Sequence, residues 1–124
     1  MDTKIIKIPN ENLDDYLNNF ISQSTKINIA VSFFFNSGLN LIIESLKKFK
    51  NKKNINIIAS NYLNSTEPNA LKTLLDLKNQ GANVYIYDSE NSKKGFHLKC
   101  YAFKDDNNNF YRTIIGSSNV SRSA

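Results

Sequence analysis

The residues best suited to chemistry lie in the last third of the chain, where the only histidine is followed two positions later by a lysine. His97 and Lys99 belong to the mostly apolar stretch 96–103, which has the composition of a short strand. Residues two apart on a strand point to the same face, so the imidazole and the ammonium would project together. The spacing predicts a nucleophile or proton carrier beside a fixed cation.

A group of small polar residues follows the next apolar run, 113–115. The stretch 104–109 between the two runs reads Lys-Asp-Asp-Asn-Asn-Asn, which is the composition of a hairpin loop. If the runs pair as a hairpin, a tight backbone with hydroxyl and amide donors comes out beside His97. The residues concerned are Gly116, Ser117, Ser118 and Asn119. Such a pocket suits a phosphate.

Structural explanations exist for the same residues. A histidine on a strand is often a satisfied structural residue. Gly116 would also serve a tight turn at a strand end, and Ser117 and Ser118 would also begin a helix. The lysine in phase with His97, together with the Gly-Ser-x-Asn segment that follows, favours the phosphate site.

Composition predicts one compact domain over residues 1–124. The chain is 40% hydrophobic with only two prolines and four glycines, enough apolar material for a modest core. Its apolar runs are far shorter than a membrane span, and no signal sequence opens the chain, so a cytoplasmic location without membrane contact is expected. The single cysteine, Cys100, excludes an internal disulfide and a multi-cysteine metal site. It is expected to face away from His97 as a small buried residue.

The charge balance favours a polyanionic partner. Lys and Arg number 16 against 11 Asp and Glu, a formal net charge of +5. This excess alone does not separate nucleic acid from a membrane surface. The lysine cluster in 47–53 is interpreted first as a solvated helix end, where cations suit the helix dipole, and only second as a DNA contact.

Strands and helices are predicted to alternate along the chain. Strand candidates are 4–8, 27–31, 55–59 and 84–87, and helices are expected after Asn10, after Ser37 and after Thr66 or Glu67. This alternation implies parallel strands joined by right-handed crossovers, and the final hairpin adds an antiparallel pair. The predicted fold class is therefore α/β with a mixed, mainly parallel sheet flanked by helices.

The third helix and the strand ends carry further expectations. The helix is expected to present Leu71, Leu74, Leu75 and Leu77 as its apolar side and to end at Gly81 in a left-handed conformation. Ligands bind beyond the carboxyl ends of parallel strands, which selects Ser32 and Asn61 as substrate-binding candidates beside Gly116 and Ser118. Residues 33–35, three phenylalanines, are interpreted as core and lid packing rather than as stacking platforms.

The order of these motifs resembles that of a known superfamily. His97-x-Lys99 followed by Gly116-Ser117-x-Asn119, after a parallel α/β half, resembles the HKD phosphodiesterases of the phospholipase D-like (PLD-like) superfamily. Over nearly the whole chain the sequence is similar to the PLD-like module at the N-terminus of bacterial DEAD/DEAH-box helicase proteins. The segments that carry this similarity are 29–33, 37–39, 61–63, 66–68, 70–71 and 115–122.

Two departures from the family pattern stand out. The family motif has an aspartate five residues beyond the lysine, where this chain has Lys104, followed by Asp105 and Asp106. These two are turn residues unless one of them reaches back to the pocket. Family members also continue beyond the motif with a helix and a strand, so the chain, which stops at Ala124, is expected to be a C-terminally incomplete fragment of a larger protein.

The resemblance implies a mechanism with two histidines. One attacks phosphorus to give a phosphohistidine, and the other protonates the leaving oxygen. Because this chain has one histidine, the second is expected from another copy in a homodimer. Lys99 and Asn119 would hold the non-bridging oxygens, and Ser117 would donate a hydroxyl or orient His97. Neither a metal nor another cofactor is implied.

The predicted function is that of a metal-independent phosphodiesterase acting on nucleic acid, with DNA favoured, in a helicase-linked or restriction and defence system. One alternative is a nucleic-acid-binding module with an incomplete site. Another is a phospholipid hydrolase, which is less favoured because no membrane-facing apolar stripe is visible in the sequence.

Overall fold

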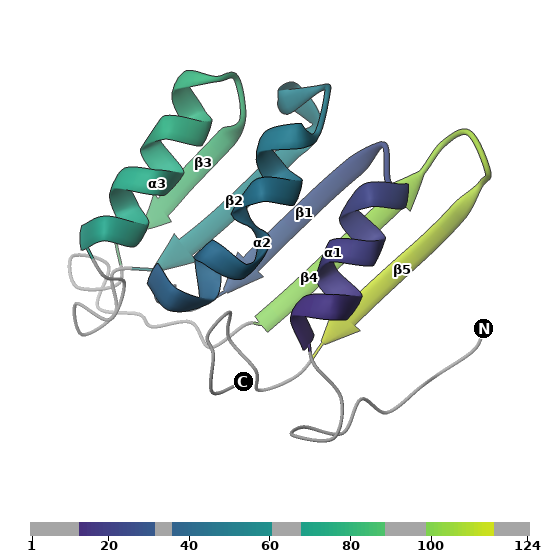
Figure 1. Cartoon of the computed structure of the whole chain (residues 1–124), viewed down its shortest axis with the longest axis horizontal. Helices are drawn as coiled ribbons and strands as arrows, with labels where there is room; N and C mark the ends of the chain where they lie inside the picture. The colour runs from purple at the N-terminus through teal and green to yellow at the C-terminus, as the bar shows by residue number, and fades with distance from the viewer. Residues whose placement is uncertain (1–12, 32–35, 61–67, 89–98, 116–124) are drawn as a thin grey trace.

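The computed structural model describes residues 13–31, 36–60, 68–88 and 99–115 of the 124-residue chain (Figure 1). In these residues three helices and five strands form an α/β domain, which confirms the predicted class. The elements are α1 (Leu13–Gln23), β1 (Lys26–Val31), α2 (Asn36–Lys48), the 3₁₀ turn η1 (Lys52–Asn54), β2 (Ile55–Ser60), α3 (Pro68–Asn79), β3 (Asn83–Tyr87), β4 (Lys99–Asp105) and β5 (Phe110–Ile115). None of the described helices is long and apolar enough to cross a membrane.

The sheet is mixed, with the strand order β3-β2-β1-β4-β5. β1, β2 and β3 are parallel, whereas β4 is antiparallel to both β1 and β5. β5 therefore runs in the same direction as β1. The carboxyl ends of β1, β2, β3 and β5 and the amino end of β4 thus lie at one edge of the sheet, which we call the carboxyl edge.

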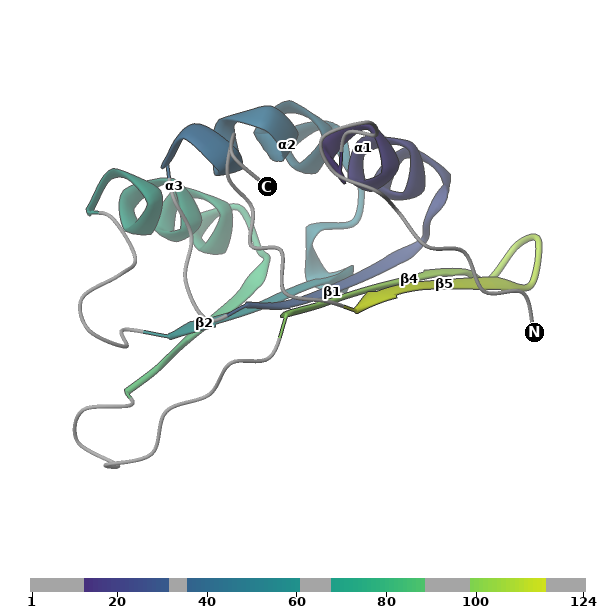
Figure 2. The same cartoon turned by 90° about the horizontal axis from the view of Figure 1, so that it is seen from below.

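All three helices cover the same face of the sheet (Figure 2). The opposite face, which no described element covers, is called the open face. Along β1 the residues Ile27, Ile29 and Val31 are buried under the helices, so Lys26, Asn28 and Ala30 belong to the open face. The alternation follows directly from the period of two in the sequence.

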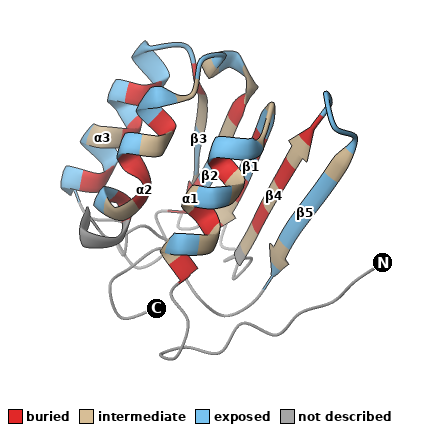
Figure 3. Cartoon of the chain, turned by 45° about the vertical axis from the view of Figure 1, so that its right-hand side comes forward, coloured by how far each residue is buried: buried red, intermediate tan, exposed pale blue. Residues whose placement is uncertain are grey.

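The core fills the space between the sheet and the helices, and buried positions recur along each helix and along the inner strands (Figure 3). Its members come from every described helix and from β1, β2 and β4: Leu13, Leu17, Ile21, Ile27, Ile29, Val31, Leu39, Ile42, Ile43, Leu46, Ile55, Ile57, Ala59, Ala70, Leu74, Leu77, Tyr101 and Phe103, with Ala82 just before β3. Three-and-four spacing puts the helical members on one side of each helix. The core therefore depends on all three helices.

The open face carries a ladder of amides across the parallel strands. Asn28, Asn56 and Asn83 are in register on neighbouring strands. The Nδ2 of Asn56 donates to Oδ1 of Asn28 at 3.0 Å, and the Nδ2 of Asn83 donates to Oδ1 of Asn56 at 2.9 Å. These bonds fix the orientation of the amides and tie β1, β2 and β3 together.

The basic segment after α2 ends that helix. The Nζ of Lys52 donates to the carbonyl of Lys47 at 2.6 Å and also to the carbonyl of Phe49. A cation bound to the last carbonyls complements the negative end of the helix dipole. For Lys52, the helix-end interpretation of the lysine cluster is thus confirmed.

Several boundaries and one helix face differ from expectation. α2 begins at Asn36, one residue before the predicted cap Ser37, and η1 was not predicted. Leu74 and Leu77 of α3 are buried, but Leu71 is 37% and Leu75 is 54% exposed, so the predicted apolar side was too wide. Gly81 has the positive φ of 112° that was expected after this helix. The strand candidate 4–8 lies outside the described residues.

Candidate functional site

The predicted site residues belong to segments that leave the sheet at the carboxyl edge. The Cα of Lys99 at the start of β4 pairs with Val31 at the end of β1, and Cys100 pairs with Ile115 at the end of β5. The ends of three adjacent strands are therefore neighbours. With about 4.8 Å between strands, Val31 and Ile115 end roughly 10 Å apart.

This register brings together the chain positions from which both halves of the motif continue. Lys99 is the first residue of β4, two positions after His97 in the sequence. The Gly-Ser-Ser-Asn segment follows Ile115 directly, on the strand paired with β4. The predicted site residues His97, Gly116, Ser117, Ser118, Asn119, Ser32 and Asn61 lie outside the described residues, as does the side chain of Lys99. Their assigned roles remain predictions.

The helix ends add a feature that motif spacing did not predict. α2 and α3 follow the carboxyl ends of β1 and β2, so their N-termini lie toward the carboxyl edge, and so does that of α1, which precedes β1 (Figure 1). Helix N-termini carry partial positive charge and favour anions. The first turns of α2 and α3 contain no acidic residue, whereas α1 has Asp14 and Asp15 there. The edge therefore gains a field that suits a phosphate mainly from α2 and α3.

Ser60, which was expected on the rim of the pocket together with Asn61 but not as a substrate-binding residue, is a polar residue at this edge. It ends β2, pairs with Tyr87 of β3 and is fully buried. The available signal was a hydroxyl residue closing an otherwise apolar strand. Buried polar groups are almost always hydrogen-bonded, so Ser60 is held in place directly before Asn61 in the sequence.

Tyr101 anchors β4 beneath the helices, two residues from Lys99. It is 1% exposed, and burial raises the pKa of its hydroxyl well above the ordinary value. The phenol therefore stays neutral at physiological pH. Cys100, between Lys99 and Tyr101, belongs to the open face, as strand alternation predicts, but it is half-buried rather than buried.

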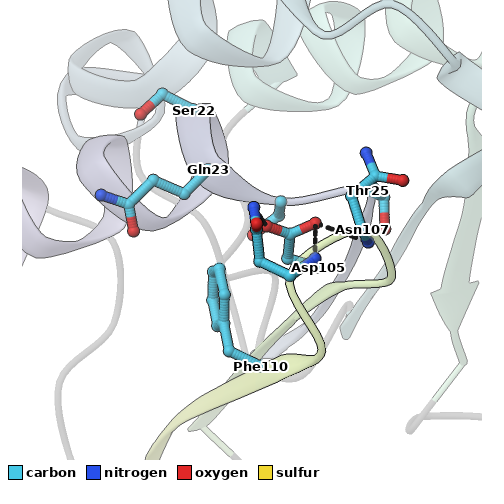
Figure 4. A pocket seen from close by; sticks show the side chains of 8 residues that line it. Ser22, Gln23, Thr25, Asp105, Asn107 and Phe110 are labelled. Atoms are coloured by element: carbon cyan, nitrogen blue, oxygen red, sulfur yellow. Dashed lines mark hydrogen bonds between the residues drawn. The ribbon is translucent and has the colours of Figure 1, made fainter.

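Asp105, the aspartate that follows Lys104, lies at the turn between β4 and β5, at the opposite end of β4 from Lys99. Asp105 lies six residues from Lys99 along β4, which at roughly 3.3 Å per residue is about 20 Å away. Asp105 is 4% exposed. Its carboxylate accepts hydrogen bonds from the backbone N–H of Asn107 at 2.9 Å and of Asn108 at 3.3 Å, and from Nδ2 of Asn108 at 2.7 Å (Figure 4). Asp105 is thus a turn residue and does not reach back to the carboxyl edge.

Asp106 and Lys104 are engaged at the same distant end. The Nζ of Lys104 lies 2.9 Å from Oδ1 of Asp106, and this hydrogen bond lowers the pKa of Asp106 and raises that of Lys104. Thr25 also donates to Asp106, at 3.2 Å, and its N–H donates to the carbonyl of Lys104 at 2.7 Å. These contacts join the hairpin to the start of β1. Neither Asp106 nor Lys104 takes part in chemistry at the carboxyl edge.

The pocket beside Asp105 is accounted for by the same turn. It is lined by residues of the α1–β1 connection and of the β4–β5 loop, among them Gln23, Thr25 and Phe110 (Figure 4). The buried carboxylate within it is already bound to loop donors. The pocket therefore lies at the end of the domain opposite the candidate site and belongs to the β4–β5 turn.

Replacing Asp105 by alanine is expected to lower stability without affecting chemistry. The loop N–H groups of Asn107 and Asn108 would lose their acceptor, a loss of about 1–3 kcal/mol in the free energy of unfolding. Urea unfolding measures this, with the exposed Asp106→Ala, expected within about 1 kcal/mol of wild type, as the matched control. Loss of phosphodiesterase activity per folded molecule at unchanged stability would instead make Asp105 the missing motif acid.

The described ranges offer no set of side chains that would hold a metal ion. They contain no cluster of three or more His, Cys, Asp or Glu side chains.

Together, a mixed five-stranded sheet and three helices on one of its faces define an α/β domain. A family model described as "Cardiolipin synthase, PLD-like domain" matches residues 17–124. The chain therefore belongs to this PLD-like family, within a superfamily of phosphodiesterase-type hydrolases. No curated protein matches the chain.

Proposed function

We propose that this chain is a metal-independent phosphodiesterase module that cleaves nucleic acid, with DNA as the favoured substrate. The observation that carries the proposal is the register at the carboxyl edge in a member of the PLD-like family. It attaches the His-x-Lys and Gly-Ser-x-Asn segments to adjacent strands of one sheet. The predicted donors then converge on a single phosphate.

In this proposal His97 is the nucleophile. Its ring nitrogen forms a bond to phosphorus while the bond from phosphorus to the leaving oxygen breaks, and a second histidine gives that oxygen a proton. Water, deprotonated by the second histidine, then displaces His97 and releases the phosphate. Lys99 and Asn119 bind the non-bridging oxygens, and Ser117 donates a further hydrogen bond.

The second histidine is proposed to come from a second copy, because the sequence contains only one. A two-fold dimer with facing carboxyl edges would supply two copies of His97 to one phosphate. The resemblance to helicase-linked modules supports placing the domain in a larger DNA-processing or restriction protein with a helicase in the same polypeptide.

The choice of nucleic acid rests on charge and on motif resemblance. The net charge of +5 suits a polyanion. The description of the matching family model favours a second candidate function, the turnover of phospholipids. The third candidate is a module that binds nucleic acid without cleaving it.

One experiment separates the three candidates. The purified chain is incubated in excess chelator with single-stranded DNA, with duplex DNA and with phosphatidylglycerol vesicles, and products are quantified for each. DNA cleavage that exceeds lipid turnover supports the proposal. Faster lipid turnover would replace it with the phospholipid enzyme, and DNA binding without any cleavage would replace it with the binding module.

A further inference from the structure

Exposed apolar side chains of the described residues gather on the outer side of α3 and β3. Four of the seven large apolar side chains that are strongly exposed belong to these two neighbouring elements. They are Leu71 and Leu75 of α3 and Tyr85 and Ile86 of β3, which are between 37% and 59% exposed. None of them has a role in the proposed chemistry at the carboxyl edge.

β3 is the outermost described strand on its side of the sheet, so its outer edge is not paired with any described strand. Proteins usually protect such an edge against pairing with another strand by a charged residue, a proline or a bulge. β3 reads Asn-Val-Tyr-Ile-Tyr, without charge or proline, and its register with β2 runs without a bulge. β5, the outermost described strand on the other side, contains Arg112. The edge of β3 is therefore the one suited to pairing with a further strand.

The two exposed leucines of α3 lie on the side of the helix that faces past this edge. α3 begins at the carboxyl edge and lies beside α2 on the same face of the sheet (Figure 1). Leu71 and Leu75 each follow a buried residue, and one step along a right-handed helix turns a side chain by about 100°. For a helix that runs in this direction, the turn leads away from α2. Ile86 belongs to the same face as α3, because it aligns with the buried Ala59.

The leucines lie at the level of the centre of β3. The N–H of Ala82 donates to a carbonyl in the last turn of α3 at 3.1 Å, so β3 starts beside the end of the helix. From Ala82 to Tyr85 the strand covers about 10 Å, the length of roughly seven helical residues. Counted back from Asn79, where α3 ends, this length reaches the interval between Leu71 and Leu75.

We infer that this surface binds a second copy of the chain, with β3 pairing antiparallel to the partner's β3 around a two-fold axis through Tyr85. In this register Val84 lies opposite the partner's Ile86, and Leu71 lies toward the partner's Leu75. Each of these contacts is apolar on both sides, and no charged residue of β3 meets its own copy. The surface is thus complementary to itself, as a two-fold interface requires.

This interface differs from the dimer that the proposed function needs. A two-fold axis perpendicular to the sheet turns the two carboxyl edges in opposite directions, so the two copies of His97 cannot share a phosphate across it. Each copy keeps its carboxyl edge for the facing-edge dimer. Pairing through β3 therefore does not depend on the proposed chemistry.

The test is disulfide cross-linking of the full chain with copper phenanthroline, in a Cys100→Ala background that removes the only native cysteine. Residues directly opposite each other in an antiparallel pair have Cα atoms about 4.5–5.5 Å apart, which suits a disulfide. Tyr85→Cys is expected to form covalent dimers at least about tenfold faster than the matched control Ile58→Cys. Ile58 is 42% exposed and aligns with Tyr85 on the same face, but it lies one strand further in. Its two copies would be about 14 Å apart.

A second substitution tests the contribution of α3. Adding Leu75→Asp to the Tyr85→Cys chain is expected to slow cross-linking about tenfold or more, because it places a carboxylate in an apolar contact. Leu75→Met, which keeps an apolar side chain of similar size, should leave the rate unchanged. Circular dichroism shows whether each variant is folded.

Three results would overturn the inference. The first is equal cross-linking of Tyr85→Cys and Ile58→Cys, and the second is an unchanged rate when Leu75→Asp is added. The third is faster cross-linking of Ile58→Cys, which would place the second copy on the open face instead. Hydrolysis of bis(p-nitrophenyl) phosphate by the wild-type chain tests the proposed function separately, so failure of one is not failure of the other.

Discussion

His97→Ala is expected to lower phosphodiesterase activity by at least about 10⁴-fold, the loss typical of removing a covalent nucleophile. The physical reason is that no other histidine in the chain can take over the attack on phosphorus. Circular dichroism shows whether the variant is folded before its activity is compared with that of wild type. Activity is measured in chelator on DNA and on bis(p-nitrophenyl) phosphate.

The matched control for this variant is Cys100→Ala. Cys100 lies one residue beyond Lys99, is half-buried and belongs to the open face, so its removal tests whether any change near the start of β4 is harmful. It should keep the rate of bis(p-nitrophenyl) phosphate hydrolysis within a few-fold. If His97→Ala retains wild-type activity, or if no phosphohistidine forms with wild type in a rapid quench, His97 is not the nucleophile.

The sequence predicted the layout of this fold well because the apolar periods are clean. Alternating Ile27, Ile29 and Val31 predict a half-buried strand, and the three-and-four spacing of Leu13, Leu17 and Ile21 predicts a helix packed on it. The parallel order and the antiparallel hairpin followed from the alternation of elements. Local patterns sufficed because each of these elements buries one side against the same core.

Prediction failed where burial depends on what lies beyond an element. Leu71 and Leu75 have the same sequence signal as Leu74, but each follows a buried residue and is turned about 100° away from the sheet. Because α3 is the outermost helix, nothing in the described structure buries that side (Figure 1). The apolar character of Leu71 and Leu75 alone could not show that α3 would be the last helix in its layer, with no neighbour to cover them.

The site residues selected by motif spacing, His97 among them, stay a prediction. The strand register describes only their neighbours along the chain: it brings the start of β4 and the end of β5 to one edge of the sheet. Spacing did not decide the role of Asp105, because its distance from Lys99 depends on how far β4 continues before the turn. Nor did spacing predict the helix N-termini at the edge, which follow from topology.

Phe103→Ala is expected to destabilise the domain more than Asp105→Ala does. Phe103 is 2% exposed in β4, and its ring packs against that of Phe20 in α1, with 5.6 Å between the ring centroids. Removing a buried phenylalanine leaves a cavity and costs about 3–5 kcal/mol. A domain of this size has only about 5–15 kcal/mol of stability, so much of the margin would be lost.

Urea unfolding of Phe103→Ala and Phe110→Ala measures this effect with a matched control. Phe110 begins β5 and is only partly buried, with the Arg112 guanidinium 4.8 Å from its ring centroid, so its truncation should cost less than half as much. Equal losses would mean that the α1–β4 contact does not dominate this part of the core. Phe103 lies in the same strand as Lys99 but four residues away from it. Phe103→Ala should therefore reduce activity only by lowering the fraction of folded protein, and the rate per folded molecule should stay unchanged.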